Sequence, residues 1–477
     1  MMDDAGGAEP RRVLFVTGRL AEPALRRIVA DLAPPVDYEV AVLRITVAAL
    51  MTTAWIARHL ENRDVPAGTD LILIPGLCEG EPQPIEDKLG VRVEKGPKDL
   101  RELPAYFGRA AAARHYGDWD IEIIAEINNA PRLTRAALNR EAEHFRASGA
   151  DLIDIGCTPG LAFPALGEVV GELVAGGMRV SVDTFEPDEI RTAVAAGAEL
   201  VLSVNGSNID VAQDLAGTGA RVVVVPDLGG TLDTLEPSLD KLARWSIPYL
   251  IDPILEPIGF GFMASLERYA EVRRRYPDAE MLMGIGNLTE LTSADSTGVN
   301  AMMIAVCQEL GVRAVLTTEV IPWARGAVRE VDVARRLMHY AITQHTVPKG
   351  IDDRLVTVKD PAVLAFTEPE LRALQAGITD PNFRIFTDRD GITVLNNERF
   401  IRSTDVINLG TLFEQLNVNE ATHAFYLGKE LARASLAVIL GKTYRQEGTL
   451  SWGYLTPPDE ARAEHVRLTQ RPDRFEP

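Results

Sequence analysis

The sequence is poor in cysteine and has no long apolar run. Its three cysteines, Cys78, Cys157 and Cys307, cannot build a disulfide framework in 477 residues, and no two have the spacing of metal ligands. No run of about 18 apolar residues occurs, so no membrane span is expected. The first twelve residues lack the apolar stretch of a signal peptide. Together these absences predict that the protein resides in a reducing cytoplasm.

Basic residues are also few. Lysine and arginine total 49 against 69 aspartates and glutamates, a net charge of −20, so nucleic acid is not an expected partner. Apolar residues make up 46% and charged residues 25% of the chain, as in globular proteins. At roughly 150 residues per domain, the length suggests about three domains. We expect small-molecule substrates and a homodimer.

The hydrophobic pattern divides the chain into residues 1–117, 118–348 and 349–477. In the first segment, strands expected over 13–16, 38–43 and 71–74 alternate with helices over 23–32 and 48–60. This alternation predicts a small α/β domain of the Rossmann or flavodoxin-like type with a parallel sheet. The turn at residues 17–19 could face a phosphate, but it lacks the spacing of a nucleotide phosphate loop, so a structural or docking role is the alternative.

The last segment predicts an α+β domain. Residues 383–387 and 392–395 alternate around an Asp-Arg-Asp-Gly turn, which is a hairpin signal, and a helix is expected over 420–440.

The middle segment contains eight short apolar runs in about 200 residues, most of them separated by helical patterns. Continuous apolar runs are typical of strands buried on both faces, and eight such β–α units predict a TIM (β/α)₈ barrel. The expected strands are 121–127, 151–155, 179–182, 199–204, 221–226, 249–251, 281–285 and 314–316.

Each of these runs ends in an acidic or amide residue, at the barrel face where TIM-barrel active sites lie. These residues are Asn128, Asp154, Asp183, Asn205, Asp227, Asp252, Asn287 and Glu319. Cations are scarce, since Lys241, on an expected helix, is the only lysine between 121 and 345. The ring favours a ligand rich in N–H donors, such as an amino-pyrimidinone edge. Mg²⁺ held by Asp183, Asp252 and Glu319 is the alternative.

Five motifs in this segment resemble those of dihydropteroate synthases, in the same order. The family reads LNVTP, GADIIDIGGESTRPG, SIDTYKPEVA, AGADIINDVSG and DPGIGFGK. The corresponding residues here are 127–131 (INNAP), 150–156 (ADLIDIG), 181–187 (SVDTFEP), 196–198 (AGA) and 252–261 (DPILEPIGFG). The resemblance covers the middle third to half of the chain and implies a pterin-binding TIM barrel.

The resemblance also implies roles for single residues. Asp183 and Asp252 match the carboxylates that meet the pterin ring, and Asn128 matches the asparagine near the Mg²⁺ and the diphosphate. These three are the expected catalytic residues. The family's next asparagine falls at Leu202, so Asn205, three residues on, is its candidate substitute. The expected pterin-binding set is Asp183, Asn205, Asp252, Asn287 and Asp154.

Other family residues have changed. The pterin-binding lysine of the seventh strand aligns with residues 286–288, and the anion-binding Arg-x-His of the eighth strand aligns near 317–319. The loop near the aminobenzoate is shortened to residues 157–160. Arg325, Arg132 and Arg135 are candidates to hold phosphate in place of the missing cations.

A second resemblance keeps an alternative open. Residues 283–289 (MGIGNLT) and 126–128 (EIN) are similar to segments of pterin-dependent methyltransferases. In that family the asparagine matched by Asn287 lies beside N5 of a methylated pterin, and a corrinoid protein is the partner. The chain itself has no DxHxxG cobalamin motif.

The C-terminal segment adds a third resemblance. Residues 423–431 (HAFYLGKEL) are similar to a domain found with dihydropteroate-synthase-like and methanopterin proteins. The whole arrangement resembles the dihydropteroate-synthase-like proteins linked to tetrahydromethanopterin biosynthesis. This implies a transferase that joins a dihydropterin-CH₂ diphosphate to an arylamine, ribofuranosyl-aminobenzene phosphate. A methyltransferase acting with a corrinoid partner and a non-catalytic pterin-binding protein are the alternatives.

Overall fold

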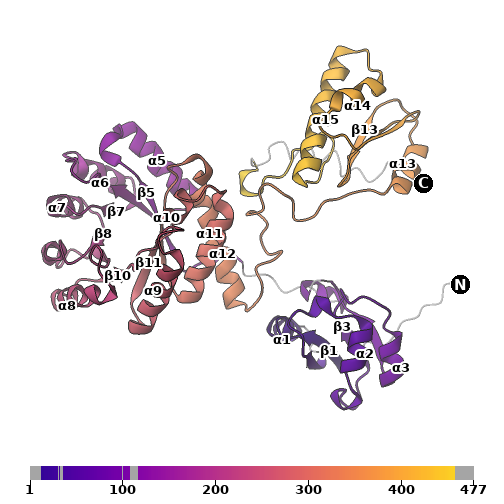
Figure 1. Cartoon of the computed structure of the whole chain (residues 1–477), viewed down its shortest axis with the longest axis horizontal. Helices are drawn as coiled ribbons and strands as arrows, with labels where there is room; N and C mark the ends of the chain where they lie inside the picture. Colours follow the sequence, from indigo (N-terminus) through magenta and orange to yellow (C-terminus); the bar gives the residue numbers. More distant parts are fainter. Residues whose placement is uncertain (1–11, 31, 33–35, 99, 108–115, 457–477) are drawn as a thin grey trace. The chain divides into compact units, whose positions relative to one another are not determined.

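Three folded regions follow one another along the chain (Figure 1). The computed structural model describes residues 12–30, 32, 36–98, 100–107 and 116–456. By Cα proximity they divide into two compact units: residues up to 119 with 336–348, and residues 120–335 with those from 349 on. No described helix has the length and apolarity needed to span a membrane.

The N-terminal region is a four-stranded parallel sheet in the order β2-β1-β3-β4, as in flavodoxin-like folds. Alternate residues of β1 and β3 face opposite sides, so α2 and α3 pack on one face, and α1 and α4 on the other. The elements are β1 (Arg12–Gly18), α1 (Glu22–Ala30), β2 (Asp37–Leu43), α2 (Thr53–His59), β3 (Leu71–Ile74), α3 (Gln83–Leu89), β4 (Arg92–Lys95) and α4 (Leu103–Tyr106).

The helix expected over 48–60 is wrong as one element. The structure has a 3₁₀ turn, Ala48–Leu50, and then α2, with Met51 extended between them. The hydroxyl of Thr52 accepts a hydrogen bond from the backbone N–H of Trp55 at 3.2 Å. This N-cap starts a new helix and explains the break.

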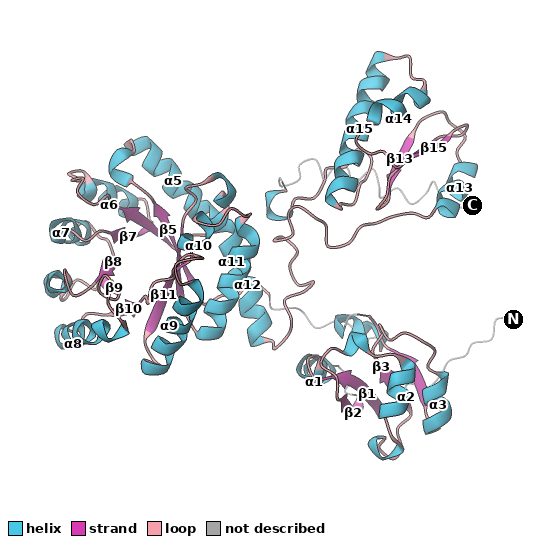
Figure 2. Cartoon of the chain, in the orientation of Figure 1, coloured by secondary structure: helices cyan, strands magenta, loops and turns pink. Residues whose placement is uncertain are grey.

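The middle region is a closed barrel of eight parallel strands inside a ring of helices, which confirms the predicted TIM-barrel fold (Figure 2). The strands are β5 (Glu122–Ile127), β6 (Leu152–Gly156), β7 (Arg179–Asp183), β8 (Leu200–Val204), β9 (Arg221–Val224), β10 (Tyr249–Ile251), β11 (Glu280–Gly284) and β12 (Ala314–Thr317). The helices are α5 (Arg135–Ser148), α6 (Leu166–Ala175), α7 (Pro187–Ala195), α8 (Leu235–Trp245), α9 (Phe262–Arg275), α10 (Gly286–Glu290), α11 (Ser296–Leu310) and α12 (Ala327–Thr343). Only a 3₁₀ segment, Ile209–Leu215, joins β8 to β9.

Inward-facing apolar side chains fill the barrel, so its interior is a packed core rather than a channel. They come from every strand except β7: Ile124, Leu152, Leu200, Leu202, Val223, Leu250, Leu282, Ala314 and the partly buried Leu316. A ligand therefore has to bind at an end of the barrel.

The C-terminal region is α+β, with its own core around a three-stranded antiparallel sheet. Its elements are α13 (Glu368–Ala376), β13 (Arg384–Thr387), β14 (Ile392–Leu395), β15 (Phe400–Ser403), α14 (Leu409–Leu416) and α15 (Ala421–Leu440). On α15, the buried Glu430 accepts hydrogen bonds from the Tyr444 hydroxyl at 2.9 Å and the Glu447 backbone N–H at 3.0 Å. This polar residue of the 423–431 motif therefore serves internal packing.

Candidate functional site

The carboxyl ends of all eight barrel strands meet at one face, because the strands are parallel and the barrel is closed. Three strand-end residues of the sequence analysis, Asp183, Asn205 and Asp252, lie there directly after or at the end of β7, β8 and β10. Asn128 follows β5, and Asn287 lies in α10, just after β11. The barrel topology thus brings these residues to a common edge.

A row of three polar residues, two of them acids, crosses three neighbouring strands below this edge. Glu126 of β5 is paired in register with Asp154 of β6, which is paired with Ser181 of β7. The Ser181 hydroxyl donates to Asp154 Oδ1 at 2.7 Å, while Oδ2 of this fully buried residue has no hydrogen-bond partner in the described structure. A Cβ at Gly156 would lie 2.4 Å from Glu126 Oε1, so glycine makes room for that carboxylate. Asp154 therefore lies beneath the mouth, and Glu126 is a site residue that was not predicted.

These acids hold protons more tightly than free carboxyls do. Burial, followed by the nearby Asp183 and Glu290 charges, raises the pKa of Glu126 to about 7. Burial and the charges of Asp183 and Glu126 raise the pKa of Asp154 well above its ordinary value, and burial raises the pKa of Asp183. Glu126, Asp154 and Asp183 are therefore a cluster of buried acids that ionise less readily than free carboxyls.

Asp252 is held in place by several bonds. The Tyr269 hydroxyl and the Ile254 backbone N–H, at 2.8 Å, both donate to Asp252 Oδ1. The Arg268 guanidinium donates to the carbonyls of Pro253 and Ile254, at 3.2 and 2.8 Å, and so fixes the loop. Burial raises the pKa of Asp252 to about 6, although these donors act in the opposite direction. The carboxylate is thus ionised at neutral pH, with Oδ2 left for a ligand.

Backbone strain marks two strand ends of the site. Ile254, a β-branched residue, has φ of +65°, and Ser203 has φ of +64°. A bulge between Val201 and Val204 of β8 accompanies Ser203, and it adds one residue relative to β9. Leu202 consequently stays in the barrel core, and the bulge shifts the chain leading to Asn205. Strain of this kind is concentrated at functional sites.

Asn287 lies beside Asp252. A Cβ placed on Gly284 would be 3.8 Å from Asn287 Nδ2 and 4.0 Å from Asp252 Oδ2, so both side chains flank this glycine. Asn287 Nδ2 donates to the Leu255 carbonyl at 3.0 Å. By contrast, Asn205 Oδ1 is occupied by the backbone N–H and the hydroxyl of Ser207, at 2.9 and 2.6 Å.

Asn128 connects the first and last strands. Its Oδ1 accepts from the Thr318 hydroxyl, and its Nδ2 donates to Glu126 Oε1 at 3.1 Å. No group of three or more His, Cys, Asp or Glu side chains in the described part of the chain is arranged to hold a metal. Mg²⁺ commonly takes one or two protein oxygens and completes its shell with water and substrate phosphate. Because Asn128 Oδ1 and Glu126 Oε1 already take part in hydrogen bonds, Mg²⁺ near Asn128 stays a prediction, in which it would neutralise phosphate charge.

Two of the three predicted phosphate-binding arginines lie in loops at this face. Arg132 ends the 3₁₀ turn after β5, and Arg325 follows the 3₁₀ turn after β12. These strands are neighbours, both side chains are exposed, and neither makes an ion pair within the described residues. Arg135, on α5, instead contacts Glu168 and Glu172 of α6, at 2.9 and 3.3 Å.

Other acidic residues of the ring have structural partners. Glu319 accepts from the Val328 backbone N–H at 3.1 Å and lies 3.1 Å from His144 Nε2, so it holds the start of α12 against α5. Asp227 accepts from the Gly206 backbone N–H at 2.8 Å.

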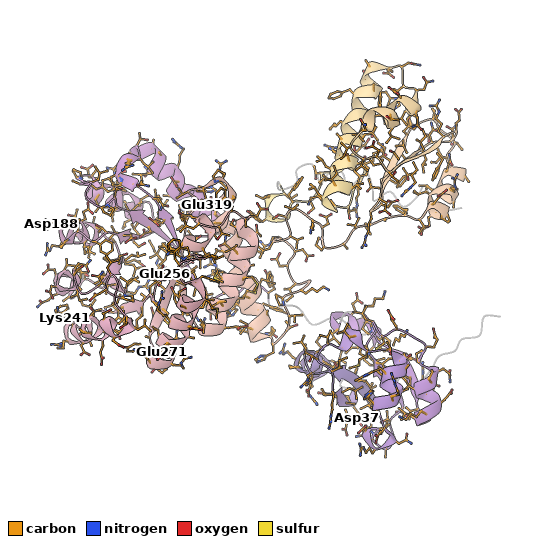
Figure 3. The ribbon with its side chains drawn as sticks, viewed as in Figure 1. Asp37, Asp188, Lys241, Glu256, Glu271 and Glu319 are labelled. Atoms are coloured by element: carbon orange, nitrogen blue, oxygen red, sulfur yellow. The ribbon has the colours of Figure 1, made fainter. Side chains whose placement is uncertain are left out.

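Lys241 is on the outer ring of helices, paired with Asp210 at 2.6 Å (Figure 3). Asp183, Asp252 and Glu319 are not arranged as a metal site.

The raised pKa of Glu126 predicts a stability effect. Between the unfolded value of 4.5 and about 7, the folded protein binds more protons, so the free energy of unfolding falls as pH rises. Glu126→Gln removes this cost, and we expect the barrel of the variant to melt roughly 3–6 °C higher at pH 8 and nearly unchanged at pH 5. Calorimetry at both pH values checks this, with the exposed Glu143→Gln as control. An equal shift at both pH values would contradict the assigned cause.

Comparison with known proteins finds two family models that match parts of the chain. Residues 132–229 match the family model described as pterin binding enzyme, and residues 11–98 match a family of unknown function, DUF6513. An uncharacterized protein of Methanocaldococcus jannaschii is 26% identical over 92% of this chain and 99% of its own length. The central part of the chain is therefore similar to pterin-binding enzymes, and the relative spans all three regions.

Solved dihydropteroate synthases are similar to the barrel region. The enzyme of Xanthomonas albilineans, in complex with 7,8-dihydropteroate, is 22% identical over 47% of this chain and 92% of that chain, with a TM-score of 0.37. The enzyme of Clostridium difficile, in the presence of pteroic acid, is 19% identical over 49% of this chain and 100% of that chain, with a TM-score of 0.39.

Proposed function

We propose that the barrel is a pterin-dependent transferase that binds its pterin at the carboxyl ends of the strands. The observation that carries this proposal is the pair Asp183 and Asp252, two fixed carboxylates at one mouth. A pterin offers a 2-amino group and ring N–H donors along one edge, which two carboxylates can accept through short, charge-assisted hydrogen bonds. The match of residues 132–229 to pterin-binding enzymes supports the same ligand.

For the reaction, we propose transfer of a dihydropterin methylene from diphosphate to an arylamine. The C–O bond to the diphosphate breaks, the amine nitrogen forms a bond to the methylene carbon, and a proton leaves that nitrogen. Positive charge that spreads into the pterin ring is stabilised by Asp183 and Asp252 in a site with little water. The released diphosphate is held by Arg132 and Arg325, whose guanidinium groups suit bidentate contacts with phosphate.

The loop after β6 bears on the choice of amine. Pro159 and Gly160 are exposed, in the segment 157–160 that stands where the resemblance places the family's aminobenzoate loop. An open loop accommodates an acceptor larger than p-aminobenzoate, such as ribofuranosyl-aminobenzene phosphate.

A second candidate reaction is methyl transfer from a methylated pterin to a corrinoid partner, which Glu126 favours. A methyl group leaves N5 more readily when the pterin is protonated, and a carboxyl with a pKa of about 7 can supply a proton at neutral pH. The resemblance to pterin-dependent methyltransferases implies that Asn287, which lies beside Asp252, would be next to N5 of the pterin.

Product detection by mass spectrometry separates these reactions. The full-length protein is incubated with hydroxymethyl-dihydropterin diphosphate, Mg²⁺ and either p-aminobenzoate or ribofuranosyl-aminobenzene phosphate. We expect the adduct with the ribosylated amine. Pterin binding with no adduct from either amine would exclude condensation and leave methyl transfer or a non-catalytic pterin-binding role.

The two loop arginines provide a quantitative test. Arg132→Met or Arg325→Met removes a bidentate phosphate contact, so we expect kcat/KM for the diphosphate substrate to fall roughly 10- to 100-fold. Binding of the diphosphate-free pterin should not change, since its ring contacts remain. Arg135→Met is the matched control, because Arg135 already pairs with two glutamates. An equal loss in all three variants would contradict a phosphate role for the two loops.

A further inference from the structure

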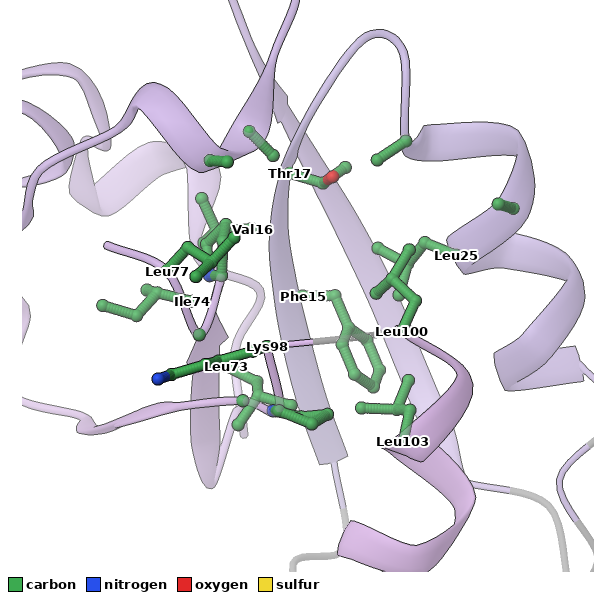
Figure 4. A pocket seen from close by; sticks show the side chains of 18 of the residues that line it. Phe15, Val16, Thr17, Leu25, Leu73, Ile74, Leu77, Lys98, Leu100 and Leu103 are labelled. Carbon is green, nitrogen blue, oxygen red and sulfur yellow. The ribbon is translucent and has the colours of Figure 1, made fainter. Parts of the chain in front are cut away.

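A cavity of about 310 Å³ lies within the N-terminal unit (Figure 4). Its walls come from the carboxyl ends of β1 and β3, from the start of α1, and from residues 47–49, 96–98, 100 and 103. Thr346 and Val347, which belong to the same compact unit, complete the lining. This volume is at the lower end of the range of small-molecule pockets.

The topology places the cavity where α/β sheets of this type bind ligands. The strand order β2-β1-β3-β4 makes β1 and β3 neighbours, while the chain leaves β1 through α1 on one face and leaves β3 through α3 on the other. The two connections diverge at the carboxyl ends of β1 and β3, and the crevice between them is the usual binding position.

Glycine keeps this crevice narrow at its base. A Cβ on Gly76, two residues after β3, would lie 2.3 Å from the Gly96 carbonyl oxygen. The two loops therefore approach each other through backbone alone, and their peptide groups reach the cavity wall.

The described part of the lining is mostly apolar. None of its 22 described residues is Asp or Glu. Phe15, Leu25, Leu73 and Leu103 form the buried wall, and the ring of Phe15 lies among the leucines (Figure 4). Among the described lining residues Lys98 is the charged one; it is exposed and pairs with no acid in the described part of the chain.

Two further features indicate that the cavity is a ligand-binding site rather than a packing void. The Thr17 hydroxyl is buried, with 3% of the residue exposed, yet its contact is a marginal 3.5 Å one to the neighbouring Gly18 carbonyl. Leu20, Leu77 and Val347 line the cavity and are about half exposed, so the rim is apolar as well. A bound molecule would cover the rim and give Thr17 a better partner.

We propose that the N-terminal domain binds a small molecule with an aromatic or alicyclic ring body and one anionic group. The rings fill the cavity against Phe15 and the leucines, the anion pairs with Lys98, and a polar ring atom bonds with Thr17. This site is separate from the barrel site, and it does not depend on the proposed pterin reaction.

Two dyes of the same shape test the proposal on the full-length protein. 1-Anilinonaphthalene-8-sulfonate carries naphthyl and phenyl rings with one sulfonate, and N-phenyl-1-naphthylamine is the same ring system without the charge. We expect saturable fluorescence with one site for each dye. Lys98→Met should weaken the sulfonate about tenfold and leave the neutral dye unchanged, since the loss corresponds to one ion pair at a half-open site. Equal effects on both dyes would overturn the assignment of the anion to Lys98.

A pair of alanine variants on one helix locates the dyes. Ala24 lines the cavity and Ala30, also on α1, is exposed and does not. Ala24→Phe should reduce the affinity of both dyes at least tenfold by filling the cavity, while Ala30→Phe should not change it. Unchanged binding in Ala24→Phe would place the dyes elsewhere and overturn the site.

A variant at the rim of the cavity tests the site independently, in case Ala24→Phe fails to fold. Val47 lines the mouth and is 38% exposed, so a carboxylate is tolerated there. Val47→Glu should weaken the sulfonate dye and spare the neutral one. If neither dye is affected, the mouth is not at this position and the proposal fails.

Discussion

Asp252→Asn is expected to weaken pterin binding by roughly 10- to 100-fold, and Asp183→Asn by a similar factor. Each substitution preserves shape but replaces a carboxyl acceptor with an amide, and a hydrogen bond to a charged group contributes about 1.5–3 kcal/mol. Every 1.4 kcal/mol is about tenfold in affinity. Titration calorimetry with 6-hydroxymethylpterin at pH 8, where Asp252 is ionised, measures the loss.

The control for both variants is Asp188→Asn. Asp188 is on α7, and 98% of its side chain is exposed on the outside of the barrel (Figure 3). Wild-type affinity in Asp188→Asn with weakened binding in the other two would support the site. If Asp183→Asn and Asp252→Asn both retain wild-type affinity, the pterin does not bind through these carboxylates.

The Asp252 carboxylate is expected to determine how pterin binding depends on pH. The pKa of Asp252 is raised to about 6, and the bound pterin uses the ionised form, so the dissociation constant should rise as pH falls below 6. At pH above 7 it should be nearly flat. In Asp252→Asn this dependence should largely disappear. A wild-type affinity that does not change between pH 8 and pH 5 would show that Asp252 is not the titrating contact.

The barrel strands could be predicted from the sequence because each is a continuous apolar run, buried on both faces. Asp183 and Asp252 were also visible, since a polar residue that closes such a run stands out. By contrast, β4 (RVEK) has one apolar residue, Val93, that packs against the core, and an edge strand of this composition leaves no clear pattern. The four-residue β15 is similarly short.

Glu126 was harder to predict because its environment is built by other strands. Its carboxylate fits only because Gly156 of β6 lacks a side chain, and its raised pKa depends on Asp183 and Glu290. The bulge at Ser203 depends on pairing with β9 in the same way. Such features arise from contacts between segments distant in sequence, which spacing along one strand does not reveal. The roles of the predicted site residues in binding stay predictions until the variants are measured.

Arg335→Met is expected to cost about 3–5 kcal/mol of barrel stability, the largest effect we predict for folding. Arg335 is fully buried on α12, toward the end of the barrel opposite the site. Its guanidinium bonds to Asp332 at 3.0 Å, to Asp151, and to the carbonyls of Ile121 and Gly149 at 2.7 and 3.1 Å. One side chain thus ties α12 to the entry of β5 and to the turn before β6. Methionine fills much of the volume but leaves Asp332, which is 2% exposed, without this cation.

Urea unfolding followed by far-UV circular dichroism measures the cost through the transition assigned to the barrel. The matched control is Arg146→Met, whose guanidinium pairs with Glu143 at the surface, with both side chains about half exposed. Surface pairs contribute about 0–1 kcal/mol, so the control should unfold near the wild type. Adding Asp332→Asn to Arg335→Met should recover part of the loss, because in Arg335→Met Asp332 would lose one of the cations that contact it and keep the half-exposed Arg329, at 3.2 Å. A loss below about 1 kcal/mol in Arg335→Met, or a further loss in the double variant, would contradict the role assigned to this buried cation.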